Sequence, residues 1–270
     1  TVETGALRLL AALEAEVVTV RVPGALTLGG TAQAENIDAQ AGAITLDRAA
    51  SLTAAKNVRL HADGDLTSDF YFAYTPAYDE LPFISADGLV EMRAGGTLWL
   101  FADVESGSLS LEAGADATLF GGFKANAGNL NITVGGDLTF TTTEPDAYEG
   151  DTRDAMALRA NGDIDIAAGG ALGALYYDRS WLELQEDSGE AARKAVTIES
   201  AAGDVSITAG TDLLTGALLA PAGNIMASAE GVLRLERAGA QGGITLRGLE
   251  SIAVSDAADD EGNRTHSLEA

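Results

Sequence analysis

The feature that most constrains this chain is a short strand pattern, opened by glycine, that recurs along nearly its whole length. Residues 128–140 (GNLNITVGGDLTF) hold two copies, and in each copy apolar and polar residues alternate. Successive strand side chains point to opposite faces, so each copy predicts one strand with a single apolar face. Strands this short become stable only when copies stack above and below them, as in a solenoid.

The central apolar residues of these strands recur with two alternating spacings. A step of eight residues, as from Leu130 to Leu138, alternates with steps that are mostly eleven to thirteen residues, so one repeat takes about 19 to 21 residues. The residues in this series are Leu7, Val18, Leu26, Ile37, Ile44, Val58, Leu66, Val90, Leu98, Leu109, Ala117, Leu130, Leu138, Ile164, Leu172, Val205, Leu213, Ile225, Leu233, Ile244 and Ile252.

This spacing predicts an all-β fold, a right-handed parallel β-helix of about ten coils. Each coil would hold two strands joined by a tight corner, followed by a longer corner that leads to the next coil. A leucine-rich repeat has a similar length but needs a helical return, for which these corners are too short.

Glycine stands just before the second strand of many of these pairs. We expect the tight corner to need a positive φ at that position, which only glycine adopts without strain. The glycines are Gly24, Gly42, Gly64, Gly96, Gly136, Gly170 and Gly231.

Charge and composition exclude several classes of partner. Sixteen Lys plus Arg stand against 41 Asp plus Glu, for a formal net charge of −25, which disfavours binding to the phosphates of nucleic acid. There is no cysteine, so disulfides and thiolate metal sites are excluded. No apolar run approaches the roughly 18 residues of a membrane-spanning helix, so we expect no membrane insertion.

Three segments interrupt the repeat, at residues 67–88, 141–155 and 173–195. Each follows the second strand of a pair, and equivalent corners of a stacked helix lie on one side. We therefore expect three loop insertions on one edge of a single domain, residues 1–255. Residues 256–270, polar and acidic, are predicted to be a tail or linker.

The interruptions are rich in aromatic and acidic residues, and all six tyrosines lie in them. Rings beside carboxylates on a rigid scaffold are typical of a surface that binds carbohydrate or protein. The alternative is that the loops fold back and cover an apolar flank of the rod. A short helix is also possible within residues 181–194. The candidate binding residues are Phe70, Tyr71, Phe72, Tyr74, Tyr78, Tyr148, Tyr176, Tyr177 and Trp181.

Catalytic motifs are absent from the sequence, and we expect no enzyme, cofactor or metal site. His61, one of two histidines, is expected to face solvent at a strand end. Outward carboxylates grouped on one sheet would suit a polysaccharide lyase or hydrolase, and Asp137, Asp163 and Asp165 are the candidates for that alternative. The acidic cluster around Asp63 and Asp65 matches no calcium-binding frame.

Five phrases of the chain resemble the repeats of filamentous haemagglutinin-type exoproteins, the large secreted partners of two-partner secretion systems in Gram-negative bacteria. They are residues 94–100 (AGGTLWL), 127–133 (AGNLNIT), 134–140 (VGGDLTF), 160–166 (ANGDIDI) and 202–208 (AGDVSIT). The resemblance covers most of the chain outside the interruptions, although the secretion domain typical of the family is not recognisable.

Membership would imply export through an outer-membrane transporter and a location outside the cell or on the bacterial surface. The family includes adhesins, stalks of contact-dependent inhibition systems and haem-acquisition proteins. We therefore expect a structural and adhesive segment that displays its loops to a host glycan or protein receptor and stacks on further repeats of a parent chain. The alternatives are a polysaccharide-active enzyme and a stalk without a ligand.

Overall fold

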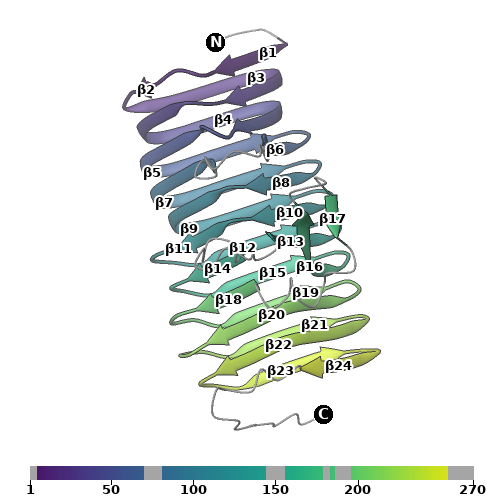
Figure 1. The fold of residues 1–270 in the computed structure, drawn as a ribbon. Coiled ribbons are helices and arrows are strands. Elements are labelled where there is room, and N and C mark those ends of the chain that lie inside the picture. Colours follow the sequence, from purple (N-terminus) through teal and green to yellow (C-terminus); the bar gives the residue numbers. More distant parts are fainter. Residues whose placement is uncertain (1–4, 70–80, 144–155, 179–182, 186–195, 255–270) are drawn as a thin grey trace.

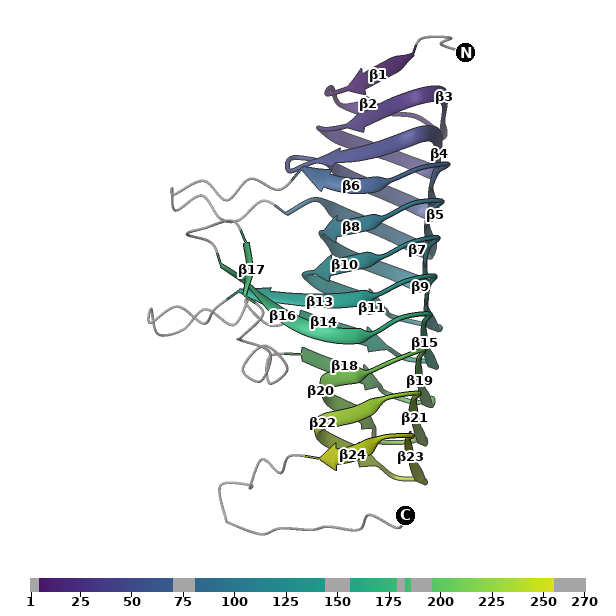
Figure 2. The ribbon, with the colours of Figure 1, turned by 90° about the vertical axis from the view of Figure 1, so that its right-hand side faces the viewer.

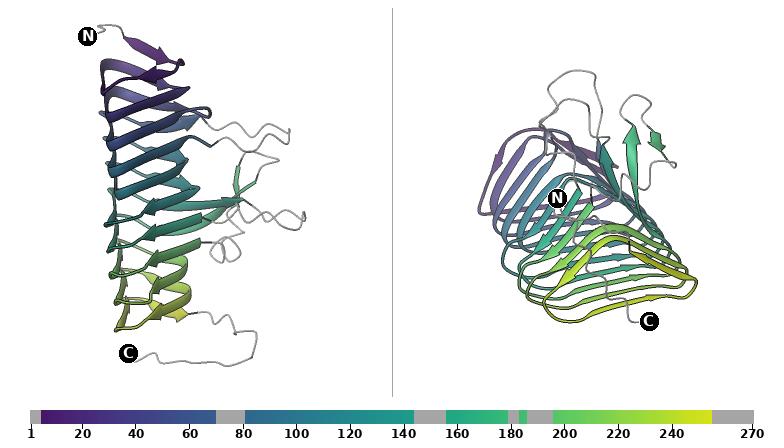
Figure 3. Two further views of the ribbon diagram at one scale, coloured as in Figure 1. Left: turned by 90° about the vertical axis from the view of Figure 1, so that its left-hand side faces the viewer. Right: turned by 60° about the horizontal axis from the view of Figure 1, so that its bottom comes forward.

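The computed structural model describes residues 5–69, 81–143, 156–178, 183–185 and 196–254. All regular structure in these residues is β-strand, and the strands stack into the coils of a rod (Figure 1). Strands in successive coils pair in parallel, which confirms the predicted parallel β-helix. Each coil has three sides, named here faces A, B and C in the order in which the chain passes them (Figure 3, right).

Some strands bend round a corner and contribute to two or three faces. These are β3 (Val17–Leu28), β4 (Thr31–Asp47), β5 (Ser51–Ala62), β7 (Phe83–Ala94), β9 (Asp103–Ala113), β20 (Leu213–Ala220) and β22 (Val232–Ala240).

The other coil strands lie on one face each. Face A has β12 (Leu130–Val134), β15 (Ile164–Ala168), β19 (Val205–Ala209), β21 (Ile225–Ala229) and β23 (Ile244–Gly248). Face B has β1 (Ala6–Leu9), β6 (Leu66–Asp69), β8 (Leu98–Phe101), β10 (Ala117–Phe120), β13 (Leu138–Thr143), β16 (Leu172–Asp178) and β24 (Ser251–Val254). Face C has β2 (Leu13–Glu14), β11 (Gly122–Ala125), β14 (Met156–Ala160) and β18 (Val196–Ser200).

The core consists of stacks in which inward side chains of the same register position lie on one another in successive coils. On face A the stack is Val18, Ile37, Val58, Val90, Leu109, Leu130, Ile164, Val205, Ile225 and Ile244, one residue in each of ten coils. On face B the stack includes Leu66, Leu98, Ala117, Leu138, Leu172 and Leu213. The two predicted strand series are therefore faces A and B, and the predicted count of about ten coils is confirmed.

Face C corrects the expectation of two strands in each coil. The longer corner contains a third strand whose inward residues form their own stack: Leu13, Ala32, Leu52, Ile84, Val104, Phe123, Leu158, Ile198, Leu218 and Ala238. These residues stand five to seven positions before the face A residue of the same coil. The third strand completes the ring of backbone hydrogen bonds around the core.

The expected role of the corner glycines is also wrong. Of the described glycines, only Gly30 and Gly121 have positive φ, at 78° and 112°, and neither lies at the corner between faces A and B. What the corner requires is space. A Cβ added at Gly24 or Gly42 would overlap or crowd a backbone carbonyl oxygen of the preceding coil, and one at Gly136 would overlap Asp116 Oδ1.

Candidate functional site

The three insertions leave the rod at one corner, between faces B and C. Each begins at the end of a face B strand, β6, β13 or β16, and the chain returns at the start of a face C strand, β7, β14 or β18. The prediction that they share one edge is therefore confirmed by the strands that flank them (Figure 2). Neighbouring strands β13 and β16 carry the second and third insertions, while β8 and β10 separate them from the first.

The insertions are shorter than predicted, because strand structure continues into their ends. Residues 67–69, 141–143 and 173–178 belong to β6, β13 and β16, and residues 83–88 belong to β7. Residues 183–185 form β17 (Glu183–Gln185) in the segment where a short helix was possible, so that helix is wrong at these residues.

Tyr176 and Tyr177 lie where β16 continues beyond its coil. They pair in parallel with Thr142 and Thr143 of β13, and on the other side they pair antiparallel with Gln185 and Leu184 of β17. Strand β17 thereby stands off the side of the rod (Figure 2). The other predicted binding residues, Phe70, Tyr71, Phe72, Tyr74, Tyr78, Tyr148 and Trp181, lie outside the described residues, as does the predicted tail at 256–270.

An aromatic cluster lies beside this edge on face B, separate from the main core. Phe101 and Phe120 are 1% and 6% exposed, and Leu81 and the half-buried Trp99 pack against them. The Phe101 ring stacks on Trp99 at 5.5 Å between centroids and lies 5.4 Å from Phe120. Sequence reasoning missed these residues. The signal was present, because Phe101 and Phe120 each extend a face B strand by one apolar residue beyond its inward alternation.

Two of the carboxylates considered for a lyase-like site bind backbone in the next coil. Asp137 Oδ1 accepts a hydrogen bond from the Ala171 N–H at 2.7 Å, and Asp163 Oδ1 accepts one from Asp204 N–H at 2.9 Å. They lie at different corners, Asp137 between faces A and B and Asp163 between faces C and A. Asp165 is exposed on face A. The structure therefore does not bring the three together.

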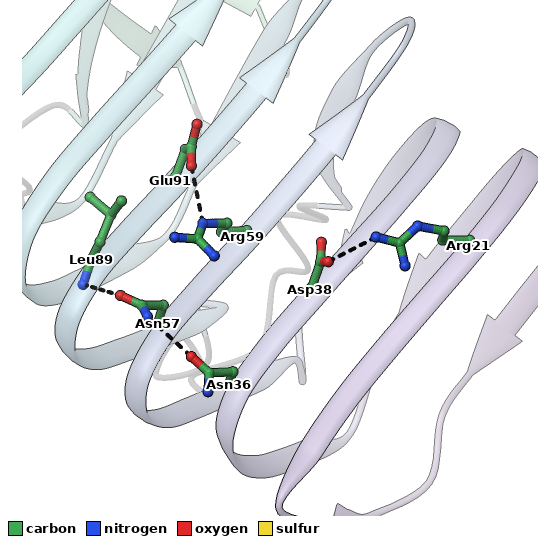
Figure 4. Close-up of polar contacts among 7 residues, drawn as sticks. All are labelled: Arg21, Asn36, Asp38, Asn57, Arg59, Leu89 and Glu91. Carbon is green, nitrogen blue, oxygen red and sulfur yellow. Dashed lines mark hydrogen bonds and ion pairs between the residues drawn. The ribbon is translucent and has the colours of Figure 1, made fainter.

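Asparagines form a similar ladder at the corner between faces C and A (Figure 4). Asn57 Nδ2 donates to Asn36 Oδ1 at 3.1 Å, and Asn57 Oδ1 accepts from Leu89 N–H at 3.0 Å. On the outer side of face A, Arg21 pairs with Asp38 and Arg59 pairs with Glu91. His61 lies exposed at the end of the same face, as predicted.

The described residues contain no group of acidic or histidine side chains able to hold a metal ion, and no helix in them is long and apolar enough to cross a membrane. No family model, curated protein or solved structure matches this chain.

Proposed function

We propose that this chain is a structural and adhesive segment of a secreted bacterial surface protein. The rod acts as a stiff scaffold, and the insertions at the corner between faces B and C are its contact surface for a host glycan or protein receptor. The observation that carries this proposal is the shared exit of all three insertions from one corner. A scaffold that places aromatic segments on a single edge concentrates contact area, and affinity then depends on a few rings.

The location and the parent chain belong to the same proposal. The resemblance to filamentous haemagglutinin-type repeats favours export through an outer-membrane transporter. It also favours further coils of a parent chain stacked on the end coils described here. The end coils fit such stacking, because Leu10 at one end is 53% exposed, and Ile244 and Leu249 at the other end are 44% and 62% exposed. Apolar side chains and open strand edges of this kind are normally covered.

The test compares three forms of the purified chain on glycan and host-protein arrays. The first is the unaltered chain. In the second, short turns replace residues 70–80, 144–155 and 179–195. The third keeps the insertions at full length but replaces Tyr71, Tyr148 and Trp181 with Ser. Circular dichroism of each form monitors the β-helix.

We expect the unaltered chain to bind at least one ligand, and both variants to lose binding while their β signal stays. A variant with short turns that still binds would place the contact surface elsewhere and contradict the proposal. An unaltered chain that binds nothing would favour a stalk without a ligand.

A further inference from the structure

Face C carries a square of four nitrogen-bearing side chains on two neighbouring coils. Lys124 of β11 and Arg159 of β14 are register partners, and Asn126 and Asn161 stand two residues after them, so all four side chains point outward on the same side. By strand geometry the square measures about 4.8 Å across the coils and about 6.7 Å along the strands.

The backbone holds this square in place. Beyond the ends of the strands, the Asn126 N–H donates to Ser106 O at 2.6 Å and the Asn161 N–H donates to Ala125 O at 2.9 Å. The coil-to-coil ladder therefore continues through both asparagines. The ladder fixes the backbone positions from which the four side chains project, so a ligand does not have to order the backbone on binding.

The charges in the square are arranged unlike those elsewhere on the described surface. Four other cations pair with an acid of a neighbouring coil: Arg21–Asp38, Lys56–Glu35, Arg59–Glu91 and Arg93–Glu112. Lys124 and Arg159 each have an acid in register on the outer side, Glu105 and Glu199. Toward each other, however, they present like charges, which are destabilising when directly opposite on neighbouring strands. An anion bound between them would relieve this repulsion.

Existing acidic partners compensate these two cations only in part. Arg159 Nε lies 3.6 Å from Glu199 Oε2, which is beyond a good hydrogen bond, and the arginine side chain is 58% exposed. Lys124 stands in register with the exposed Glu105 of the preceding coil, but within the part of the chain that the structure describes it forms no ion pair. The two cations are thus available to a ligand.

The four side chains line a groove of about 320 Å³, together with Ala125, Ala160, Glu199 and Ala201. In the following coil, Ala201 takes the outward position beside the asparagines, and its small side chain leaves that side of the groove open. The volume lies at the lower end of the range for small-molecule sites. It suits a ligand about the size of one sugar ring or one small organic acid.

We propose that this groove binds a carboxylate group. Arg159 and Lys124 would pair with the carboxylate oxygens, and the amides of Asn126 and Asn161 would hydrogen-bond to neighbouring hydroxyl groups of the same ligand. A net charge of −25 repels polyanions strongly, so a ligand with one charge at the site is favoured over a polyphosphate. The carboxylate comes either from a uronic acid residue of a saccharide or from a free small organic acid.

This site does not depend on the proposed role of the insertions. It lies at the end of face C that leads to face A, whereas the insertions join face C at its other end, and none of its lining residues belongs to an insertion. Loss of binding on the insertion edge and loss of binding in the groove are therefore separate results.

The experiment is a titration of the whole chain, at low salt, followed by two-dimensional ¹H–¹⁵N NMR. The ligands are galacturonate, its neutral methyl ester, and sodium acetate. The variants are Lys124→Gln and Arg159→Gln, each of which keeps a polar stem and removes one charge. The matched control is Arg237→Gln, which removes one charge from an exposed residue of face C outside the groove.

We expect galacturonate to shift the amide signals of residues 124–126 and 159–161. Each groove variant should bind it about tenfold more weakly, the usual effect of losing one charge-assisted hydrogen bond. The neutral methyl ester should not bind. The Arg237→Gln variant should bind the acid as tightly as the unaltered chain does. If acetate competes, the groove accepts any small carboxylate. If acetate does not compete, the groove recognises the uronic acid of a saccharide. The proposal is overturned if neither acid shifts these signals, if the ester binds equally well, or if Arg237→Gln weakens binding as much as the groove variants.

Discussion

Gly170 leaves open the space that the Asp137 carboxylate of the preceding coil occupies. A Cβ added at Gly170 would overlap Asp137 Oδ1, the atom that accepts the Ala171 N–H at 2.7 Å. The aspartate in one coil thus caps the backbone of the next coil, and the glycine in that next coil makes room for it. One residue alone would not complete this corner.

The same pairing recurs wherever the aspartate is present at the corner between faces A and B. Asp65 is followed in the next coil by Gly96, Asp116 by Gly136, Asp137 by Gly170 and Asp212 by Gly231, and each aspartate accepts a backbone N–H there. Where the earlier coil has Thr97 or Ala171 instead, the position of the glycine holds Ala115 or Thr211. At these four corners the glycine accompanies the aspartate because of space, with no demand on φ. Gly42 and Gly64 follow coils without the aspartate, and a Cβ there would instead crowd a backbone oxygen of the preceding coil.

Gly170→Ala is therefore expected to destabilise the chain by about 1–3 kcal/mol, the usual range for overpacking a closely fitted site. Chemical denaturation of the purified chain measures this loss. The second change Asp137→Ala in the same chain should recover part of it, since the overlapping oxygen is gone. Thr211→Ala, at the equivalent position after Ala171, is the control and should change stability little. Asp137→Ala alone measures the cost of losing the bond to Ala171 N–H. If the losses of the two single variants simply add in the double variant, the carboxylate is not the cause of the Gly170→Ala loss.

Faces A and B were predictable because Leu130 and Leu138 belong to a series with a repeated step of eight residues. Face C was not identified, because its second inward residue is small in most coils, as at Ala34, Ala54 and Ala86, and because several of its strands run into face A without a turn. The shared edge of the insertions was predictable because each interruption comes directly after a face B strand. The groove could not be predicted from the sequence, because it depends on the register between Lys124 and Arg159, and an insertion separates these two residues in the sequence.

Leu138→Asp tests the register of face B directly. Leu138 is 0% exposed and lies between Ala117 and Leu172 in the stack. An aspartate there would bury an unpaired carboxylate among aliphatic side chains, so we expect a loss of more than about 4 kcal/mol or an insoluble product. Thr139→Asp, one residue later on the outer side, should fold normally in thermal unfolding followed by circular dichroism. A Leu138→Asp chain that unfolds cooperatively at an unaltered temperature would refute this register.

Asn57→Ala is expected to cost about 1–3 kcal/mol, because it leaves the Leu89 N–H without its acceptor and removes the hydrogen bond to Asn36 (Figure 4). Asn57→Asp keeps an acceptor for Leu89, and the Asn36 amide group is able to turn and donate to the new carboxylate. The aspartate variant should therefore be closer in stability to the unaltered chain. Urea unfolding of both variants gives the comparison. If they lose equal stability, the acceptor at Leu89 is not what holds this corner.

Arg59 stands in register between two acids, Asp38 on one side and Glu91 on the other, with its Nε 3.3 Å from Glu91 Oε2. The pair is exposed, so Arg59→Gln should cost less than about 1 kcal/mol. Arg59→Glu would instead place three acids in a row on a chain of net charge −25, and we expect a larger loss at low salt that diminishes as salt screens the repulsion. Adding Glu91→Arg to Arg59→Glu gives the new acid an opposite charge on one side but leaves Asp38 on the other, so it should recover part of the loss. Thermal unfolding of these variants is measured at 10 mM NaCl, where the screening length is about 30 Å, and at 500 mM NaCl, where it is about 4 Å. A loss that persists undiminished at high salt would mean that the arginine acts through the packing of its stem on face A and not through its charge.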